Sequence, residues 1–123
     1  MRKAVNAAII RKGRILLVRK LETWILPGGK PEGKETDIEC LTRELGEELP
    51  TVQLRNPRFY KQFTGPTPHT EDTIEVSVYL ADIKGEPSAG AEINAVGRFR
   101  GGNCPQSEIT DKIVASLRQD GYL

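Results

Sequence analysis

The sequence is poor in cysteine, histidine and aromatic residues, and it has no long apolar run. Among its 123 residues are two cysteines and one histidine, and aromatic residues make up 6%. The longest apolar runs, such as Ile15-Leu16-Leu17-Val18, are far shorter than the roughly 20 residues of a membrane-spanning helix. The basic start, Met1-Arg2-Lys3, lacks the apolar stretch of a signal peptide. Cys40 and Cys104 do not have metal-site spacing, and such an isolated pair favours reduced thiols and a cytoplasmic location.

A charge excess of either sign is also missing. Eighteen basic and 17 acidic residues give a net charge of +1, which argues against bulk electrostatic binding of nucleic acid but permits a nucleotide ligand. With 37% hydrophobic and 28% charged residues, the composition is typical of a soluble globular protein. The length predicts a single domain over residues 1–123.

Apolar and polar residues are arranged as expected for a mixed α/β fold. Residues 74–80 alternate between apolar and polar, which predicts a half-buried strand. The apolar run at 15–18 fits a strand that is buried on both faces. The order of strands and helices predicts a mixed sheet with helices packed against it. Further strands are expected at 4–11, 24–26, 52–63 (interrupted near 56–57) and 95–99, with turns or loops at 12–13, 65–68 and 85–90.

Two helices are predicted from capping residues and apolar spacing. The segment Thr36-Asp37-Ile38-Glu39 is a capping box. Pro50 cannot continue the helix, so the helix should end near Glu48. Ser107 is expected to cap a second helix that stops at Gly121. The predicted core positions are Ile38, Leu41, Leu45 and Leu49 in the first helix, and Ile109, Ile113 and Leu117 in the second.

Three acids on the first helix are badly placed for helix stability. Glu44, Glu47 and Glu48 share one stripe beside the core, where each like-charged pair costs roughly 0.2–0.5 kcal/mol. They lie in the last turns, where the helix dipole favours cations by about 0.3–1 kcal/mol. Gly46 costs about 1 kcal/mol more than alanine. A solvated acidic face, supported by Arg43 and Glu47, is one explanation. A divalent cation is the other, and oxygen-only ligands favour magnesium, manganese or calcium over zinc.

The wider pattern resembles the Nudix box. Gly29 is followed after five residues by Glu35 and after seven more by Arg43-Glu44-Leu45, one residue, and Glu47-Glu48; Leu26-Pro27-Gly28-Gly29 is similar to the usual lead-in. The resemblance extends over nearly the whole chain. It implies an α/β/α sandwich around a mixed β-sheet, and hydrolysis of a pyrophosphate bond in a nucleoside diphosphate linked to another group.

The resemblance also implies roles for the box residues. It makes Arg43 and Glu35 the pair that orients the site, and Glu44 and Glu47 catalytic as well as metal-binding. The chain departs from the pattern at Pro50-Thr51, where the family has glycine and an aliphatic residue, and this puts the placement of Glu48 in question. The implied ligands of magnesium, or of manganese, are Glu44, Glu47, Glu48 and the Gly29 carbonyl.

Residues outside the box are open to two interpretations each. The general base in this family lies in the box or in a later loop, and Glu92 is the candidate from the loop, or else an ordinary loop acid. Lys30, Arg19 and Lys20 could meet phosphate oxygens or be solvated surface residues. His69 is interpreted as a solvated loop residue rather than a base.

Substrate choice is the least determined property. The compact chain favours a MutT-type enzyme that hydrolyses nucleoside triphosphates. Pro66, about fifteen residues past the box, resembles a marker of the ADP-ribose branch and keeps a dinucleotide substrate as the alternative. A non-catalytic nucleotide sensor is a third possibility, although the box acids are all present. Either a monomer or a homodimer is compatible with the sequence, and no membrane partner is expected. Trp24, Phe63 and Tyr79 could stack on a base, but core packing is favoured for each.

Overall fold

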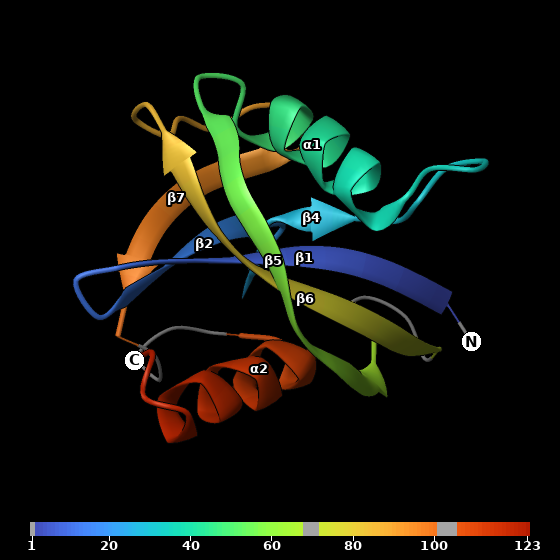
Figure 1. The fold of residues 1–123 in the computed structure, drawn as a ribbon, viewed down its shortest axis with the longest axis vertical. Coiled ribbons are helices and arrows are strands. Elements are labelled where there is room, and N and C mark those ends of the chain that lie inside the picture. Colours follow the sequence, from blue (N-terminus) through green and yellow to red (C-terminus); the bar gives the residue numbers. More distant parts are fainter. Residues whose placement is uncertain (1, 68–71, 101–105) are drawn as a thin grey trace.

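Two helices cover opposite faces of a twisted sheet in the computed structural model, which describes residues 2–67, 72–100 and 106–123. Figure 1 shows α1 (Asp37–Glu48) above the sheet and α2 (Glu108–Gln119) below it. This is the α/β/α sandwich that the sequence predicted. Neither described helix has the length and apolarity to cross a membrane.

The sheet is mixed. The strand order is β3-β2-β1-β6-β5, with β4 paired to β1 and β7 paired to β2. Strands β1 and β6 run parallel, and the other described pairs are antiparallel. The strands are β1 (Arg2–Arg11), β2 (Arg14–Lys20), β3 (Thr23–Ile25), β4 (Gly28–Gly29), β5 (Gln53–Pro66), β6 (Thr73–Lys84) and β7 (Ile93–Phe99).

Each face of the sheet has its own apolar core. In β2, Ile15 and Leu17 belong to the core under α2, whereas Leu16 and Val18 belong to the core under α1. Successive strand side chains point to opposite faces, so this apolar run is buried on both sides as predicted. The alternation at 74–80 is also confirmed, because its apolar members all face the α2 side: Ile74, Val76, Val78 and Leu80.

Helix α1 begins and ends where its capping residues predict. The Glu39 amide donates to the Thr36 hydroxyl at 3.2 Å, and the Thr36 amide donates to the Glu39 carboxylate at 3.0 Å, which completes the capping box. The helix ends at Glu48, one residue before the Leu49 cap. Ile38 was expected in the core, but it is 38% exposed, and the buried position in that part of the helix belongs to Cys40. The other predicted core positions are confirmed: Leu41, Leu45 and Leu49.

Helix α2 matches its prediction. The Ser107 hydroxyl accepts a hydrogen bond from the Thr110 amide, and the helix ends at Gln119, just before Gly121. Its predicted core residues are buried: Ile109, Ile113 and Leu117.

Several strands are longer than predicted because of partners distant in the sequence. Strand β1 begins at Arg2, which pairs with Ile74. Strand β5 continues through Gly65 and Pro66, so the predicted loop at 65–68 was wrong over those two residues. Strand β7 begins at Ile93 rather than at residue 95. The predicted interruption at 56–57 takes the form of a register shift in β5. Local pattern alone does not contain these pairings.

Candidate active site

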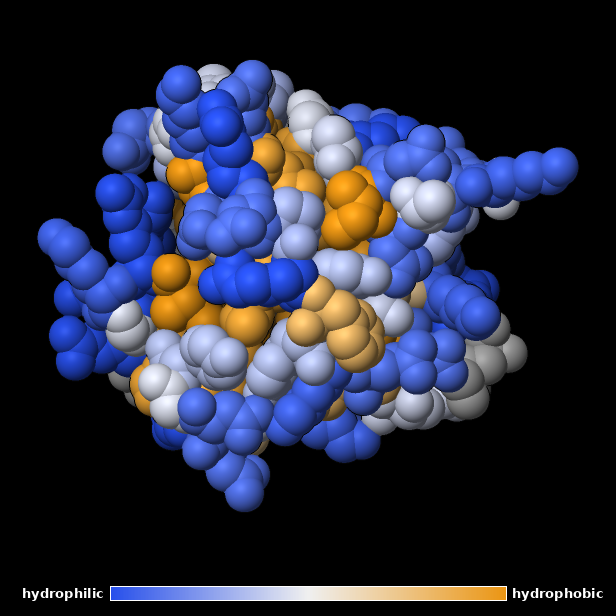
Figure 2. Space-filling view, viewed as in Figure 1, coloured by the Kyte–Doolittle hydropathy of each residue, from blue (hydrophilic) through white to orange (hydrophobic). Residues whose placement is uncertain are grey.

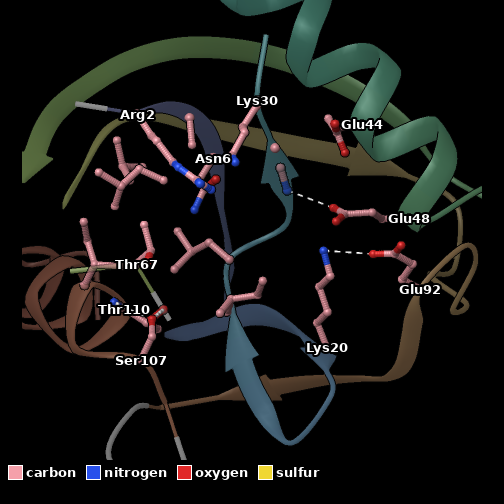
Figure 3. Close-up of a pocket in the computed structure, with 18 of the residues that line it drawn as sticks. Arg2, Asn6, Lys20, Lys30, Glu44, Glu48, Thr67, Glu92, Ser107 and Thr110 are labelled. Atoms are coloured by element: carbon pink, nitrogen blue, oxygen red, sulfur yellow. Dashed lines mark hydrogen bonds and ion pairs between the residues drawn. The ribbon is translucent and has the colours of Figure 1, made fainter. Parts of the chain in front are cut away.

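A cavity of about 740 Å³ lies between the last turns of α1 and the start of α2. The residues that line it come from both helices and from the strands β1, β2, β3, β4 and β6 (Figure 3). One rim is acidic and belongs to α1, with Glu44, Glu47 and Glu48. The apolar part of the wall consists of Ala4, Ile25, Leu26, Ile74, Val76, Ala91 and Ile109.

Glu48 is the most buried acid of the rim. It is 8% exposed, and the Gly28 amide donates to its Oε1 at 2.9 Å. Burial raises the pKa of Glu48 to about 7, against the lowering effect of that hydrogen bond. Gly28 has φ 146°, and a Cβ there would lie 2.1 Å from the Val5 carbonyl oxygen. Only glycine therefore fits the strand that holds Glu48 in place.

Arg43 joins the loop before α1 to the acidic rim. Its Nε and Nη2 donate to the two carboxylate oxygens of Glu35 at 2.8 and 3.0 Å, which is a bidentate pair. Its Nη2 also donates to the Lys30 carbonyl at 3.0 Å. Its Nη1 lies 2.9 Å from a Glu44 carboxylate oxygen and 3.4 Å from one of Glu47. The hydrogen bond from Arg43 holds the pKa of Glu35 below its usual range.

The donor set of the rim fits a hard divalent cation. Its carboxylates and the nearby carbonyl are all oxygen donors, which suit magnesium, calcium or manganese. Glu44 lies directly against Gly29: a Cβ on Gly29 would be 2.3 Å from the Glu44 carboxyl carbon. Burial raises the pKa of Glu44, so a cation beside it would relieve an unfavourable charge. The Gly29 carbonyl accepts a weak hydrogen bond from the Cys40 thiol at 3.6 Å.

The three acids are divided between two partners in this arrangement. Arg43 contacts Glu44 and Glu47, whereas Glu48 accepts from the Gly28 amide. Within residues 2–67, 72–100 and 106–123, no three acidic, histidine or cysteine side chains are close enough together to hold a metal ion.

Of the candidate phosphate-binding and base residues outside the box, three line the cavity and one does not. Lys30, Lys20 and Glu92 line the cavity. Lys20 Nζ lies 2.9 Å from a Glu92 carboxylate oxygen, and this contact holds the pKa of Glu92 below its usual range. Figure 3 shows Glu92 and Glu48 on the same side of the cavity. Arg19 does not line the cavity. As the residue before Lys20 on a strand, it points to the opposite face.

Cys40 and the aromatic residues behave as packing residues. Burial raises the pKa of the Cys40 thiol to about 11, so it is not an activated nucleophile. Trp24 packs edge-on against Phe99 at 4.8 Å, Phe63 lies against the core under α2, and the Tyr79 hydroxyl donates to Asp37. His69 and Cys104 lie outside the described residues.

Some cavity residues were missed by the sequence analysis. Asn6 carried a signal, because it is a polar residue within an otherwise apolar strand. Ser107 was recognised only as a helix cap. Arg2, Thr67 and Thr110 carried no comparable signal, because only the approach of β1, the end of β5 and α2 brings them to the cavity.

Comparisons with known proteins find one matching family and similar solved structures. The family model described as NUDIX domain matches residues 1–110. The MutT NUDIX hydrolase from Burkholderia pseudomallei is 28% identical, with a TM-score of 0.83 over 94% of this chain and 97% of that one. The E. coli ORF135 protein is 24% identical, with a TM-score of 0.78 over 98% and 93% of the two chains.

A more distant structure has the same fold. An ADP-ribose pyrophosphatase from Streptococcus suis is 21% identical, with a TM-score of 0.67 over 95% of this chain and 87% of that one. Comparison with curated protein sequences finds no match. The family match over residues 1–110, the sandwich fold and the box glutamates that line the cavity lead to one conclusion: the chain belongs to the Nudix family of pyrophosphohydrolases.

Proposed function

We propose that this protein is a magnesium-dependent, MutT-type pyrophosphohydrolase that acts on nucleoside triphosphates as a single domain over residues 1–123. The observation that carries the proposal is the cavity, whose acidic rim adjoins an apolar wall within about 740 Å³. A cavity of this size and composition suits a ligand with a charged polyphosphate end and a flat, largely apolar base. The 28% identity to a protein described as a MutT NUDIX hydrolase supports the same choice.

In this proposal Glu44, Glu47, Glu48 and the Gly29 carbonyl hold the magnesium ion. When bound, magnesium supplies charge neutralisation of the pyrophosphate and lowers the pKa of a water ligand. Manganese has a similar preference for oxygen donors and is expected to substitute. Glu35 acts through Arg43, whose bidentate contact orients the guanidinium beside the metal ligands.

The remaining cavity residues would handle the phosphates and the proton. Both Lys20 and Lys30 line the cavity and are suited to bind phosphate oxygens. In Figure 3 the Lys20 side chain points toward Glu48 and Glu92, whereas the Lys30 side chain points toward Asn6. Glu92 is the proposed general base, since its carboxylate lines the cavity on the same side as Glu48, where it could accept a proton from the attacking water. Arg19 is left out of this proposal because it does not line the cavity.

A dinucleotide such as ADP-ribose is the alternative substrate. Pro66, the residue that resembles the marker of that branch, ends β5 beside Thr67, which lines the cavity. A different backbone path at residues 66–67 would alter the part of the cavity remote from the acidic rim. A sensor without activity is the alternative of another class.

The deciding experiment is a hydrolysis screen of the purified protein. Ribo- and deoxyribonucleoside triphosphates, ADP-ribose and dinucleotides are each incubated with magnesium, manganese or EDTA, and product release is measured. We expect hydrolysis of at least one triphosphate with magnesium and none with EDTA. Glu47→Gln should lower kcat by about 100-fold or more. The exposed loop acid Glu22, which does not line the cavity, provides the matched control Glu22→Gln.

The outcomes separate the three candidates. Preference for ADP-ribose over every triphosphate would reject the MutT-type proposal. Equal inactivity of the wild type and Glu47→Gln on all substrates, together with tight nucleotide binding, would identify a sensor.

A further inference from the structure

Glu92 belongs to a loop, residues 85–92, that packs on the carbonyl end of α1. The Gly90 amide donates to the Glu48 carbonyl at 2.8 Å, and the Ile93 amide donates to the Gly90 carbonyl at 2.9 Å. The Thr51 hydroxyl donates to the Glu86 carbonyl and lies 3.1 Å from the Ser88 hydroxyl. The loop is therefore bonded to the segment just after α1 at several points.

Gly90 is where the loop comes closest to the helix end. A Cβ at Gly90 would lie 2.6 Å from the Glu47 carbonyl oxygen, 2.6 Å from Pro50 Cδ and 3.0 Å from Pro50 Cγ. Real Cβ atoms do not approach other heavy atoms at 2.6 Å, and both neighbours are rigid, since one is a helix backbone and the other a proline ring. Any side chain at position 90 would push the loop away from α1.

Pro50 and Thr51 are the two residues that depart from the Nudix pattern, and both contact this loop. The Pro50 ring occupies the space that a side chain at Gly90 would need. The Thr51 hydroxyl donates to the Glu86 carbonyl of the loop. The two residues that depart from the Nudix pattern thus pack against a loop whose glycine, Gly90, lies forty residues after Pro50.

We propose that Gly90 is a positioning residue, whose missing side chain lets residues 85–92 pack on the end of α1 and hold the Glu92 carboxylate at the cavity rim beside Glu48. The inference rests on the proposed role of Glu92 as base. Glu92 is two residues after Gly90 and lies on the same side of the cavity as Glu48 (Figure 3). Its carboxylate forms an ion pair with Lys20. A displacement of about 1 Å in a catalytic group can cost about 100-fold in rate.

The test compares Gly90→Ala, Glu92→Gln and the double variant in steady-state kinetics with magnesium. We expect Gly90→Ala to lower kcat by about 10- to 100-fold with little change in KM. In the Glu92→Gln background the same substitution should have almost no further effect on kcat. Gly65→Ala is the matched control, because a Cβ at Gly65 meets only ordinary contacts with Ile109 at 3.5 Å or more.

Amide hydrogen exchange without metal gives a second readout that does not depend on activity. Gly90→Ala should speed the exchange of the amides at positions 90 and 93, whereas Gly65→Ala should not. Adding Pro50→Gly to Gly90→Ala removes the ring atoms and should restore part of the protection and part of kcat.

Three results would overturn the inference: an unchanged kcat in Gly90→Ala, losses that multiply in the double variant, or unchanged exchange at positions 90 and 93. If the wild type hydrolyses no substrate, the proposed function fails, while the exchange measurement still tests the packing of the loop. If Glu92→Gln is fully active but Gly90→Ala is not, Gly90 does not act through Glu92 and the inference is wrong.

Discussion

At the scale of single residues, the three acids of the box differ more than their shared spacing suggests. Glu47 has a side chain 53% exposed and lies 3.4 Å from Arg43, so its charge is hydrated and partly compensated. Glu48 is 8% exposed, and both Glu44 and Glu47 act to raise its pKa further. Burial, with repulsion from the neighbouring acids added to it, therefore disfavours the charged form of Glu48 and also that of Glu44.

Neutralising Glu48 should stabilise the protein when no divalent metal is present. At pH 8, Glu48→Gln removes a buried negative charge but keeps an oxygen to accept from the Gly28 amide. We expect the free energy of unfolding in EDTA to rise by about 1–3 kcal/mol. Magnesium should then raise the melting temperature of the wild type more than that of the variant. A variant that melts below the wild type in EDTA would contradict this account of the rim.

Lys20 should set the pH at which activity is lost on the acid side of the pH–rate profile. Its contact lowers the pKa of Glu92, and the proposed base must be ionised. In Lys20→Met this pKa returns upward toward its ordinary value, so activity is lost at higher pH as the solution is acidified. The acid limb of kcat/KM against pH should therefore shift modestly to higher pH, since both side chains are partly exposed.

Lys30 provides the control for this measurement. It lines the same cavity, and no ion pair of its side chain is found among the described residues. Lys30→Met should weaken substrate binding without moving the acid limb. Equal shifts in both variants would show that Lys20 acts only through the substrate.

At the scale of the element, α1 depends on the capping box at its start. Its last turn carries acids and no basic residue, so the helix has no favourable charge at its carbonyl end. Stability must come from the cap and from the apolar face formed by Cys40, Leu41 and Leu45. The two hydrogen bonds between Thr36 and Glu39 satisfy amides that would otherwise lack partners in the first turn.

Removing the cap should cost stability without removing the site. We expect Thr36→Ala to lower the free energy of unfolding by about 1 kcal/mol, measured by urea denaturation. Thr42→Ala on the same helix is the control, since the Thr42 hydroxyl donates to the Ile38 carbonyl one turn earlier and caps no free amide of the first turn. Equal losses in the two variants would argue that the box contributes nothing beyond ordinary helix contacts.

At the scale of the whole molecule, two apolar cores share one sheet. Leu41 belongs to the core under α1 and Ile113 to the core under α2, and alternate residues of β2 enter both. Loss of either core exposes one face of the same strands. Unfolding should therefore be a single transition.

Substitutions in either core should lower the free energy of unfolding of the whole protein, and unfolding should remain a single cooperative transition. Leu41→Ala and Ile113→Ala should each cost about 2–5 kcal/mol. Urea denaturation followed by tryptophan fluorescence and by circular dichroism should give coincident curves. Ile38→Ala is the control on α1. Because Ile38 is 38% exposed, this substitution should lower the free energy of unfolding much less than either core variant does. Separate transitions for the two probes would show that the cores unfold independently.

Local signals in the sequence were sufficient for the helix limits and for the acidic stripe. The box at Thr36, the stop at Pro50 and the three glutamates act over three or four residues, and tertiary contacts did not override them. The alternation in β6 worked for the same reason, since period two is a local property of a strand. The Nudix resemblance extended these local features to the whole fold.

Tertiary structure alone decided which members of each pattern became buried and which reach the cavity. Ile38 fits the apolar spacing of α1 but projects away from the core, while Glu48 fits the acidic stripe and is buried. Arg19 and Lys20 are adjacent in sequence and lie on opposite faces of the sheet, so only Lys20 reaches Glu92 and the cavity. The physical reason is that burial and pairing depend on segments tens of residues apart, whereas helix and strand periodicity depends on neighbours along the chain.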